Sequence, residues 1–171
     1  MTALIRLLLL TGCRLGEILT LKWQYIDYEN RCLRLPDSKT GAKTVYLSPP
    51  ALLVLEGMKP LEGNPYVIYS EDNVGHMAPP QKAWRRIRKK AQLEDVRLHD
   101  LRHSCASIAA ASGMSLHMIG ALLGHKQPQT TARYAHLIGD PLREAAEIVS
   151  QRLKLVASEQ PIQLKLKERG K

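Results

Sequence analysis

The sequence predicts an α+β fold that is mostly α-helical, with a small three-stranded antiparallel sheet on one side of a helical core. Apolar residues recur at helical spacing near the N-terminus, and again from residue 81 almost to the end of the chain. Between these regions, three short runs rich in β-branched and aromatic residues are separated by turn-forming residues. The 171 residues suit one domain that can bury a core.

The first helical pattern runs from Thr2 to about Leu21. Because Gly12 lies inside it, we expect a break near Thr11 and a second helix that begins near Arg14. The leucines before Thr11 resemble a lipoprotein signal, but Arg6 leaves only four of them in a row, whereas a signal needs about 7–15 apolar residues. The pattern begins without capping residues, so we expect that a preceding N-terminal part is missing.

The sheet is expected from three strands at residues 25–28, 32–35 and 44–47, separated by turn residues at 29–30 and 36–41. Pro49 and Pro50 end the sheet and open a helix over residues 51–58. The stretch 60–80 is typical of a loop, with one possible short strand at 67–69.

The rest of the chain is predicted to be helical. Gly113 and Gly124 are expected to end two helices, and Ser115 to cap the second. A further helix is expected to begin around Gln129 and to carry Tyr134. The helical pattern begins at residue 81 and continues almost to the end of the chain, with separate helices expected over residues 99–112, 115–123 and 141–156.

The charge balance favours a polyanionic partner. Lys and Arg total 25 against 16 acidic residues, which gives a net charge of +9. A basic protein that is merely soluble is the alternative. The few aromatic residues argue against base stacking on single strands. One helix gathers cations that would contact a DNA backbone: Lys82, Arg85, Arg86, Arg88, Lys89 and Lys90.

No metal or cofactor is expected. The three cysteines lack CxxC spacing, which indicates reduced thiols in a cytoplasmic protein. His99 and His103 stand four apart and could bind zinc, but no third ligand lies near them and no HExxH motif is present. No stretch is long and apolar enough to span a membrane.

A set of polar residues matches what phosphodiester exchange requires. That reaction needs a nucleophile, cations around two non-bridging oxygens, and a proton donor for the leaving oxygen. Arginine suits the second task and lysine or histidine the third. The candidates, in chain order, are Arg14, Lys39, His99, Arg102, His125 and Tyr134.

These residues lie in motifs that resemble the tyrosine recombinases of the phage-integrase type. The family pattern is TGxRxxE, a lysine on a hairpin turn, HxLRH, LGH and a tyrosine about nine residues on, and all occur here in order over about residues 4–150. The resemblance implies a catalytic domain over residues 1–156, and the polar, basic composition at the C-terminus predicts a mobile tail over residues 157–171. By the same resemblance, we expect the family's separate N-terminal DNA-clamp domain to be absent from this sequence.

By this resemblance, Tyr134 attacks the scissile phosphate and forms a 3′-phosphotyrosyl link, without metal or ATP. Arg14 and Arg102 clamp the phosphate, and Lys39 protonates the leaving 5′ oxygen. A free phenol has a pKa of about 10, and we expect the two guanidinium groups to favour the phenolate of Tyr134.

The resemblance also implies supporting roles. His99 acts as an acid/base or phosphate ligand, and His125 donates a hydrogen bond to the phosphate. Glu17 holds Arg14 in place, and His103 holds its own motif. Taken singly, each residue has an ordinary alternative, such as a surface pair between Arg14 and Glu17.

The implied partner is double-stranded DNA, bound by a homotetramer that exchanges the helix at residues 141–156. Two alternatives remain. A type IB topoisomerase shares much of this residue set, and a non-catalytic DNA-binding module could use the helices around Gly113 and Gly124 as a helix-turn-helix.

Overall fold

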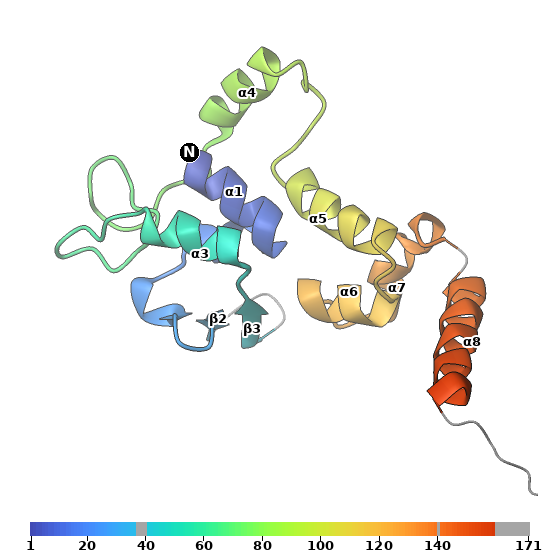
Figure 1. Ribbon diagram of the computed structural model, residues 1–171. Helices are drawn as coiled ribbons and strands as arrows, with labels where there is room; N and C mark the ends of the chain where they lie inside the picture. The colour runs from blue at the N-terminus through green and yellow to red at the C-terminus, as the bar shows by residue number, and fades with distance from the viewer. Residues whose placement is uncertain (37–40, 140, 160–171) are drawn as a thin grey trace, which may run out of the picture. The chain divides into compact units, whose positions relative to one another are not determined.

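The computed structural model describes residues 1–36, 41–139 and 141–159, with only the backbone of residues 141, 142, 144 and 155–159. It divides into two compact units, Met1–Ile138 and Gly139–Lys171. The expected domain over residues 1–156 therefore includes the first unit and part of the second. The first unit consists of helices and one three-stranded antiparallel sheet, which confirms the predicted fold class (Figure 1).

The break predicted in the first helical pattern is confirmed. Helix α1 (Thr2–Thr11) ends where Gly12 adopts a left-handed conformation with φ of 61°, and Gly12 donates its N–H to the carbonyl of Leu8. Helix α2 (Leu15–Leu19) follows, with Arg14 at its N-cap.

The predicted meander is confirmed, with small shifts at the strand ends. Strands β1 (Ile26–Asp27), β2 (Cys32–Leu35) and β3 (Lys43–Tyr46) pair in the order β1-β2-β3. Leu33 of β2 stands opposite Ile26 on one side and Val45 on the other, and all three side chains are buried. A short 3₁₀ helix, η1 (Trp23–Tyr25), precedes the sheet, so Tyr25 is not part of a strand.

Helix α3 (Pro49–Glu56) packs along α1. After it, residues 57–80 form the predicted loop, but the expected short strand at 67–69 is not present. Isolated bridges occur instead, between Lys22 and Tyr66 and between Tyr69 and His76.

The C-terminal part of this unit contains helices α4 (Gln81–Lys90), α5 (Asp100–Ala111), α6 (Leu116–Leu123) and α7 (Pro128–Ala132), and a 3₁₀ helix, η2 (Ala135–Leu137). As predicted, Ser115 caps α6, where its Oγ accepts the N–H of Met118, and Gly124 ends α6 in a left-handed conformation. Tyr134, expected within a helix, instead lies between α7 and η2.

The buried side chains form two clusters within Met1–Ile138. The larger lies among α1, the sheet and α3, with Leu7, Leu33 and Leu55 at its centre. The smaller lies between α5 and α6 and includes Ile119, Leu123 and the ring of Tyr134. Arg102 bonds to the end of α1, beside the larger cluster, and to Leu123 of the smaller one.

The second unit contains helix α8 (Pro141–Glu159), and Ile148, Val149 and Leu153 form an exposed apolar stripe along it. Among the described helices of either unit, none is both long and apolar enough to cross a membrane.

Candidate active site

One cavity collects most of the predicted catalytic side chains. It has a volume of about 460 Å³ and is lined by Arg14, His99, Arg102, His125, Lys126, Gln127 and Thr130. Four of the six predicted catalytic residues therefore lie around one cavity. Two of them, Arg14 and His125, are 111 residues apart in the chain. Lys39, the fifth, lies outside the described residues, and Tyr134, the sixth, does not line this cavity.

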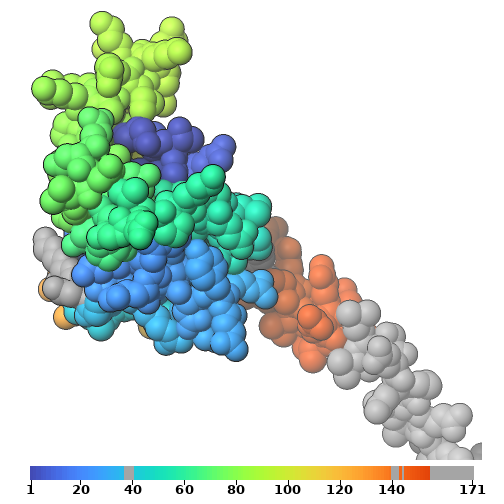
Figure 2. All heavy atoms as spheres, turned by 90° about the vertical axis from the view of Figure 1, so that its left-hand side faces the viewer, coloured from blue at the N-terminus to red at the C-terminus, as the bar shows by residue number. Residues whose placement is uncertain are grey.

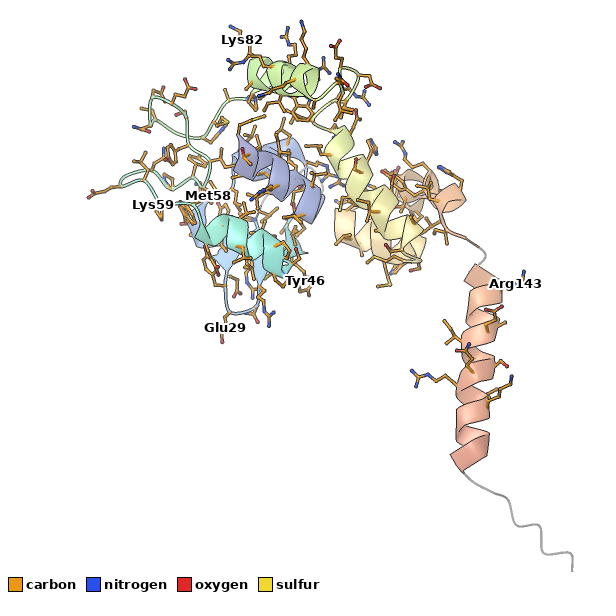
Figure 3. The ribbon with its side chains drawn as sticks, turned by 45° about the horizontal axis from the view of Figure 1, so that its top comes forward. Glu29, Tyr46, Met58, Lys59, Lys82 and Arg143 are labelled. Atoms are coloured by element: carbon orange, nitrogen blue, oxygen red, sulfur yellow. The ribbon has the colours of Figure 1, made fainter. Side chains whose placement is uncertain are left out.

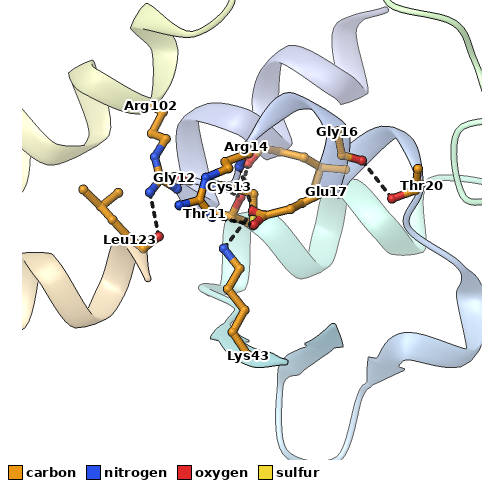
Figure 4. A network of polar contacts seen from close by, with 11 residues as sticks. Thr11, Gly12, Cys13, Arg14, Gly16, Glu17, Thr20, Lys43, Arg102 and Leu123 are labelled. Atoms are coloured by element: carbon orange, nitrogen blue, oxygen red, sulfur yellow. Dashed lines mark hydrogen bonds and ion pairs between the residues drawn. The ribbon is translucent and has the colours of Figure 1, made fainter. Parts of the chain in front are cut away.

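Arg102 joins the two buried clusters. It is 4% exposed, and its guanidinium donates to the carbonyl of Gly12 at the end of α1 and to that of Leu123 at the end of α6, the second at 2.6 Å (Figure 4). Gly12 is needed at this point, because a Cβ atom there would lie 2.8 Å from Leu123 Cδ2. Burial, and then Arg14, lower the pKa of Arg102, but a guanidinium remains charged at neutral pH. The cavity therefore has a fixed cation in its wall.

Arg14 is held by Glu17. The Glu17 side chain is only 5% exposed, and its carboxylate accepts the backbone N–H of Arg14 at 2.8 Å and Arg14 Nη1 at 3.0 Å. The contact expected from the sequence is present.

A third donor to Glu17 was missed in the sequence. Lys43 Nζ lies 2.7 Å from Glu17 Oε2, and the Lys43 side chain is 11% exposed (Figure 4). Burial opposes ionisation of Glu17, but the hydrogen bonds from Lys43 and Arg14 outweigh it and lower the pKa of Glu17. Glu17 is therefore a carboxylate shared by two cations.

His125 is fixed by the turn that ends α6. Its backbone N–H donates to the carbonyl of Gly120, and its Nδ1 lies 2.9 Å from Thr131 Oγ1. Burial, followed by the charges of Arg102 and Arg14, lowers the pKa of His125 to about 4. His125 is therefore neutral at neutral pH and suits the role of a neutral hydrogen-bond donor. Thr131, which is 2% exposed, was also missed in the sequence.

Tyr134 contacts His103 directly. Its hydroxyl lies 2.6 Å from His103 Nδ1, and the Tyr134 residue is 5% exposed. The His103 ring in turn lies edge-on to the ring of His99, which lines the cavity, at 5.0 Å between centroids. His103 was expected to support its own motif; the structure places it between the phenol and the cavity.

The expectation about the ionisation of Tyr134 is wrong. Burial raises the pKa of the phenol, and this outweighs the opposing effect of Arg133 and then of Arg102. The sequence indicated the nearby cations but not the depth at which the ring is buried. Tyr134 is therefore a protonated phenol with a histidine nitrogen beside it to accept the proton.

The basic helix α4 is anchored by two of its residues. Trp84 Nε1 and Arg88 Nη1 both donate to the carbonyl of Val96, at 2.9 and 3.0 Å. Figure 2 shows side chains of α4 extending from one end of the first unit, and Figure 3 shows Lys82 pointing away from it. Six residues of α4 were predicted to contact the DNA backbone. Of these, Arg88 is partly buried, and the exposed ones are Lys82, Arg85, Arg86, Lys89 and Lys90.

Within the described part of the chain, no group of three or more His, Cys, Asp or Glu side chains is arranged to hold a metal ion.

Comparisons with known proteins agree with this geometry. The family model described as "Phage integrase family" matches residues 1–139. The chain is 34% identical over 143 residues to tyrosine recombinase XerA of Saccharolobus solfataricus, covering 82% of this chain and 47% of that protein. It is 34% identical over 130 residues to the shufflon-specific DNA recombinase of Escherichia coli, covering 74% of this chain and 32% of that protein.

The fold is shared with the Tn1549 transposon integrase, solved in complex with circular intermediate DNA. The TM-score is 0.70 at 20% identity, covering 86% of this chain and 59% of that one. This chain spans about a third to a half of the length of the two curated relatives named above. The match over residues 1–139 and the identity to XerA together show that the chain belongs to the phage integrase family, the tyrosine recombinases.

Proposed function

We propose that this chain is the catalytic part of a site-specific recombinase, which cleaves and rejoins double-stranded DNA through a 3′-phosphotyrosyl intermediate. The observation that supports it most is the convergence of Arg14, Arg102, His99 and His125 on one cavity. The names of XerA and of the shufflon-specific enzyme as recombinases, and the DNA in the Tn1549 integrase complex, support the same reaction.

The first step is binding of a scissile phosphate in the cavity. Arg14 and Arg102 contact its non-bridging oxygens, because a guanidinium offers several N–H donors at fixed charge. His125, which is neutral, donates a further hydrogen bond to the phosphate and adds no charge. The cations stabilise the charge that develops on the phosphorus oxygens in the transition state.

The second step is attack by Tyr134. Its oxygen forms a bond to phosphorus while its proton passes to His103 Nδ1, 2.6 Å away. The bond from phosphorus to the 5′ oxygen breaks, and that oxygen takes a proton, from Lys39 by the family resemblance. Rejoining is the reverse: the 5′ hydroxyl attacks, and Tyr134 recovers its proton. One phosphate ester replaces another, so no ATP is consumed.

Attack requires the Tyr134 oxygen to come within reach of the phosphorus. Tyr134 is buried and does not line the cavity. We therefore infer that DNA binding brings the tyrosine and the phosphate together, with His99 and His103 lying along the path between them.

The same proposal includes two kinds of partner, which are DNA and further copies of this protein. The exposed cations of α4 contact the DNA backbone, and four copies of the protein assemble on DNA in the cytoplasm. The apolar stripe of Ile148, Val149 and Leu153 on α8 is the surface that a neighbouring copy would cover when the helix is exchanged.

A trapping assay tests the proposed activity. The protein is mixed with a pool of nicked duplexes of varied sequence, so that the cleaved end diffuses away, and SDS-resistant adducts are detected. We expect an adduct with the wild-type protein and with Tyr46→Phe, an exposed tyrosine on β3, and none with Tyr134→Phe. An adduct of normal yield from Tyr134→Phe would exclude this tyrosine as the nucleophile.

A further inference from the structure

A buried carboxylate beside the phosphate cavity is shared by two cations, only one of which lines the cavity. Glu17 accepts Arg14 Nη1 on one oxygen, and the Arg14 backbone N–H and Lys43 Nζ on the other, at 3.0, 2.8 and 2.7 Å. Arg14 lines the cavity, whereas Lys43 does not. Lys43 reaches Glu17 from the first position of β3, 26 residues further along the chain.

The net charge of Glu17 and its two cation partners determines how strongly Arg14 attracts a phosphate. A carboxylate this deeply buried needs compensation, since an unpaired buried charge is costly. With Lys43 present, Arg14, Lys43 and Glu17 carry a net charge of +1. Without Lys43, Arg14 would be the remaining cation partner of Glu17 among the described residues, and the pair would be neutral.

We propose that Lys43 is a positioning residue for strand cleavage, which neutralises Glu17 so that the positive charge of Arg14 remains available to the scissile phosphate. This inference rests on the proposed DNA-cleaving function. It assigns a role to a residue on the sheet that neither contacts the cavity nor belongs to a motif of the family resemblance. Glu17 then orients Arg14 by accepting the backbone N–H and Nη1 of Arg14. Lys43 balances the negative charge of Glu17.

The burial of the three side chains supports this division of roles. Exposed fractions are 5% for Glu17, 11% for Lys43 and 23% for Arg14, so the residue that lines the cavity is the most exposed of the three. At such low exposure, solvent screens the charges poorly. The two hydrogen bonds that Glu17 makes to Arg14 fix the direction of the guanidinium, and an error of about 1 Å in such a group costs roughly 100-fold in rate.

A charge-compensation experiment tests the proposal. A duplex that the full chain cleaves is first taken from the nicked pool, and single-turnover cleavage rates are measured on it. Lys43→Met is expected to reduce the rate by on the order of 10- to 100-fold. Lys43→Arg, which keeps the charge, is expected to retain most of the rate.

The double variant Lys43→Met/Glu17→Gln is the decisive one. It restores the net charge of +1, and the glutamine oxygen can still accept one of the two N–H groups that Arg14 donates to Glu17, so we expect it to cleave faster than Lys43→Met alone. A role of Lys43 in stability alone predicts no such recovery. A double variant as slow as Lys43→Met, or a Lys43→Met variant as fast as the wild type, would overturn the proposal.

The matched control lies on the same sheet. Arg34 of β2 pairs with Asp27 at 2.6 Å, but its side chain is 62% exposed. Arg34→Met removes a comparable ion pair from an exposed face, and we expect its cleavage rate to remain close to that of the wild type.

A binding measurement separates this inference from the proposed activity. Inorganic phosphate is titrated into each variant while the side-chain N–H resonance of Arg14 is followed by NMR. We expect Lys43→Met to weaken phosphate binding by on the order of tenfold, and the double variant to recover it. Equal phosphate affinity in wild type and Lys43→Met overturns the inference. A wild-type protein that forms no adduct contradicts the proposed function alone.

Discussion

At the scale of the residue, Arg102 has a structural role and, by the proposed function, a chemical one. Its guanidinium satisfies the buried carbonyls of Gly12 and Leu123 while it also lines the cavity. Arg102→Ala leaves both carbonyls without this donor, and an unsatisfied buried group costs about 1–3 kcal/mol. We expect a loss of about 2–4 kcal/mol in the free energy of unfolding, together with a fall in cleavage rate of at least about 100-fold.

Denaturant unfolding and trapping rates measure the two effects. The control is Arg97→Ala near the start of the same helix, where Arg97 pairs with Asp100 on the surface and its side chain is 74% exposed. A surface pair is worth at most about 1 kcal/mol, so Arg97→Ala should stay close to the wild type. If Arg102→Ala lost no stability, the bonds to the two carbonyls would not hold the clusters together.

His125 makes stability depend on pH. Its pKa is about 4 in the folded protein, below the ordinary value of 6.5, because of burial and then of Arg102 and Arg14. Between pH 6.5 and about 4 the unfolded chain binds a proton that the folded protein does not, so the free energy of unfolding falls as the pH falls through this window. The pKa values of His99 and His103 are lowered as well, first by burial, and act in the same direction.

We expect His125→Gln to flatten this pH dependence. The shift corresponds to a ceiling of about 3 kcal/mol at pH 4, and the real change is smaller because solvent reaches the cavity. Chemical unfolding at several pH values between 7 and 4 measures it. His117→Gln, at an exposed histidine of α6, should keep the wild-type slope, and an unchanged slope in His125→Gln would be inconsistent with a neutral His125.

The sequence predicted which residues form the site better than it predicted their contacts and burial. Arg14, His99, Arg102 and His125 were identified from motif spacing, and they meet at one cavity. Lys43 and Thr131 were missed because their contacts join segments whose distance only the fold reveals. The direction of the Tyr134 pKa shift was predicted wrongly for the same reason, because the local sequence does not show how deeply a side chain is buried.

At the scale of the element, α4 separates exposed cations, which we propose contact DNA, from residues that pack on the protein. Lys82, Arg85 and Arg86 are exposed, whereas Arg88 donates to the carbonyl of Val96. We expect a glutamine at Lys82, Arg85 or Arg86 to weaken DNA binding across sequences and to reduce the slope of log affinity against log salt by about 0.9 each.

Arg88→Gln is the internal control for α4. It should reduce the free energy of unfolding by about 1–3 kcal/mol, as expected for the loss of a hydrogen bond from a charged group, and change the salt slope little. Fluorescence anisotropy at several salt concentrations gives the slopes. Identical slopes for wild type and the variants at Lys82, Arg85 and Arg86 would place the DNA elsewhere.

Element boundaries were predicted where glycine or proline marks them, as at Gly12 and Gly124. The end of α4 was not predicted, because no glycine or proline stands there. Gln92 takes the left-handed conformation with φ of 57°, and residues 91–99 are not helical. In the loop after α3, where a short strand was possible at residues 67–69, the backbone forms isolated bridges at Tyr66 and Tyr69, and the Asn64 amide donates to the carbonyls of Asn73 and Gly75.

At the scale of the whole molecule, both buried clusters lie within Met1–Ile138. We expect a protein truncated after Gly139 to unfold cooperatively and to lose less than about 1 kcal/mol of stability, because none of the core side chains that the structure describes is removed. Assembly on DNA should weaken, since the proposed exchange uses α8.

Thermal unfolding and native mass measurements of the DNA complex test these two expectations separately. A truncated protein without a cooperative transition would show that Gly139–Lys171 is needed for folding. A truncated protein that still forms tetramers on DNA would contradict helix exchange through α8.

The fold class and the meander were predictable for the whole molecule because they follow from periodicity and turn residues. The division after Ile138 was not, since the helical pattern of residues 141–156 looks the same whether or not it packs on the preceding unit.

The central claim is that Tyr134 becomes covalently bonded to a DNA 3′ phosphate, and identification of the linkage tests it most directly. The trapped adduct is digested with nuclease and protease, and the modified peptide is sequenced by mass spectrometry. We predict that the peptide containing Tyr134 carries a nucleotide joined through its 3′ phosphate, with a free 5′ hydroxyl on the released strand. A nucleotide on another residue, or one joined through a 5′ phosphate, would contradict the mechanism.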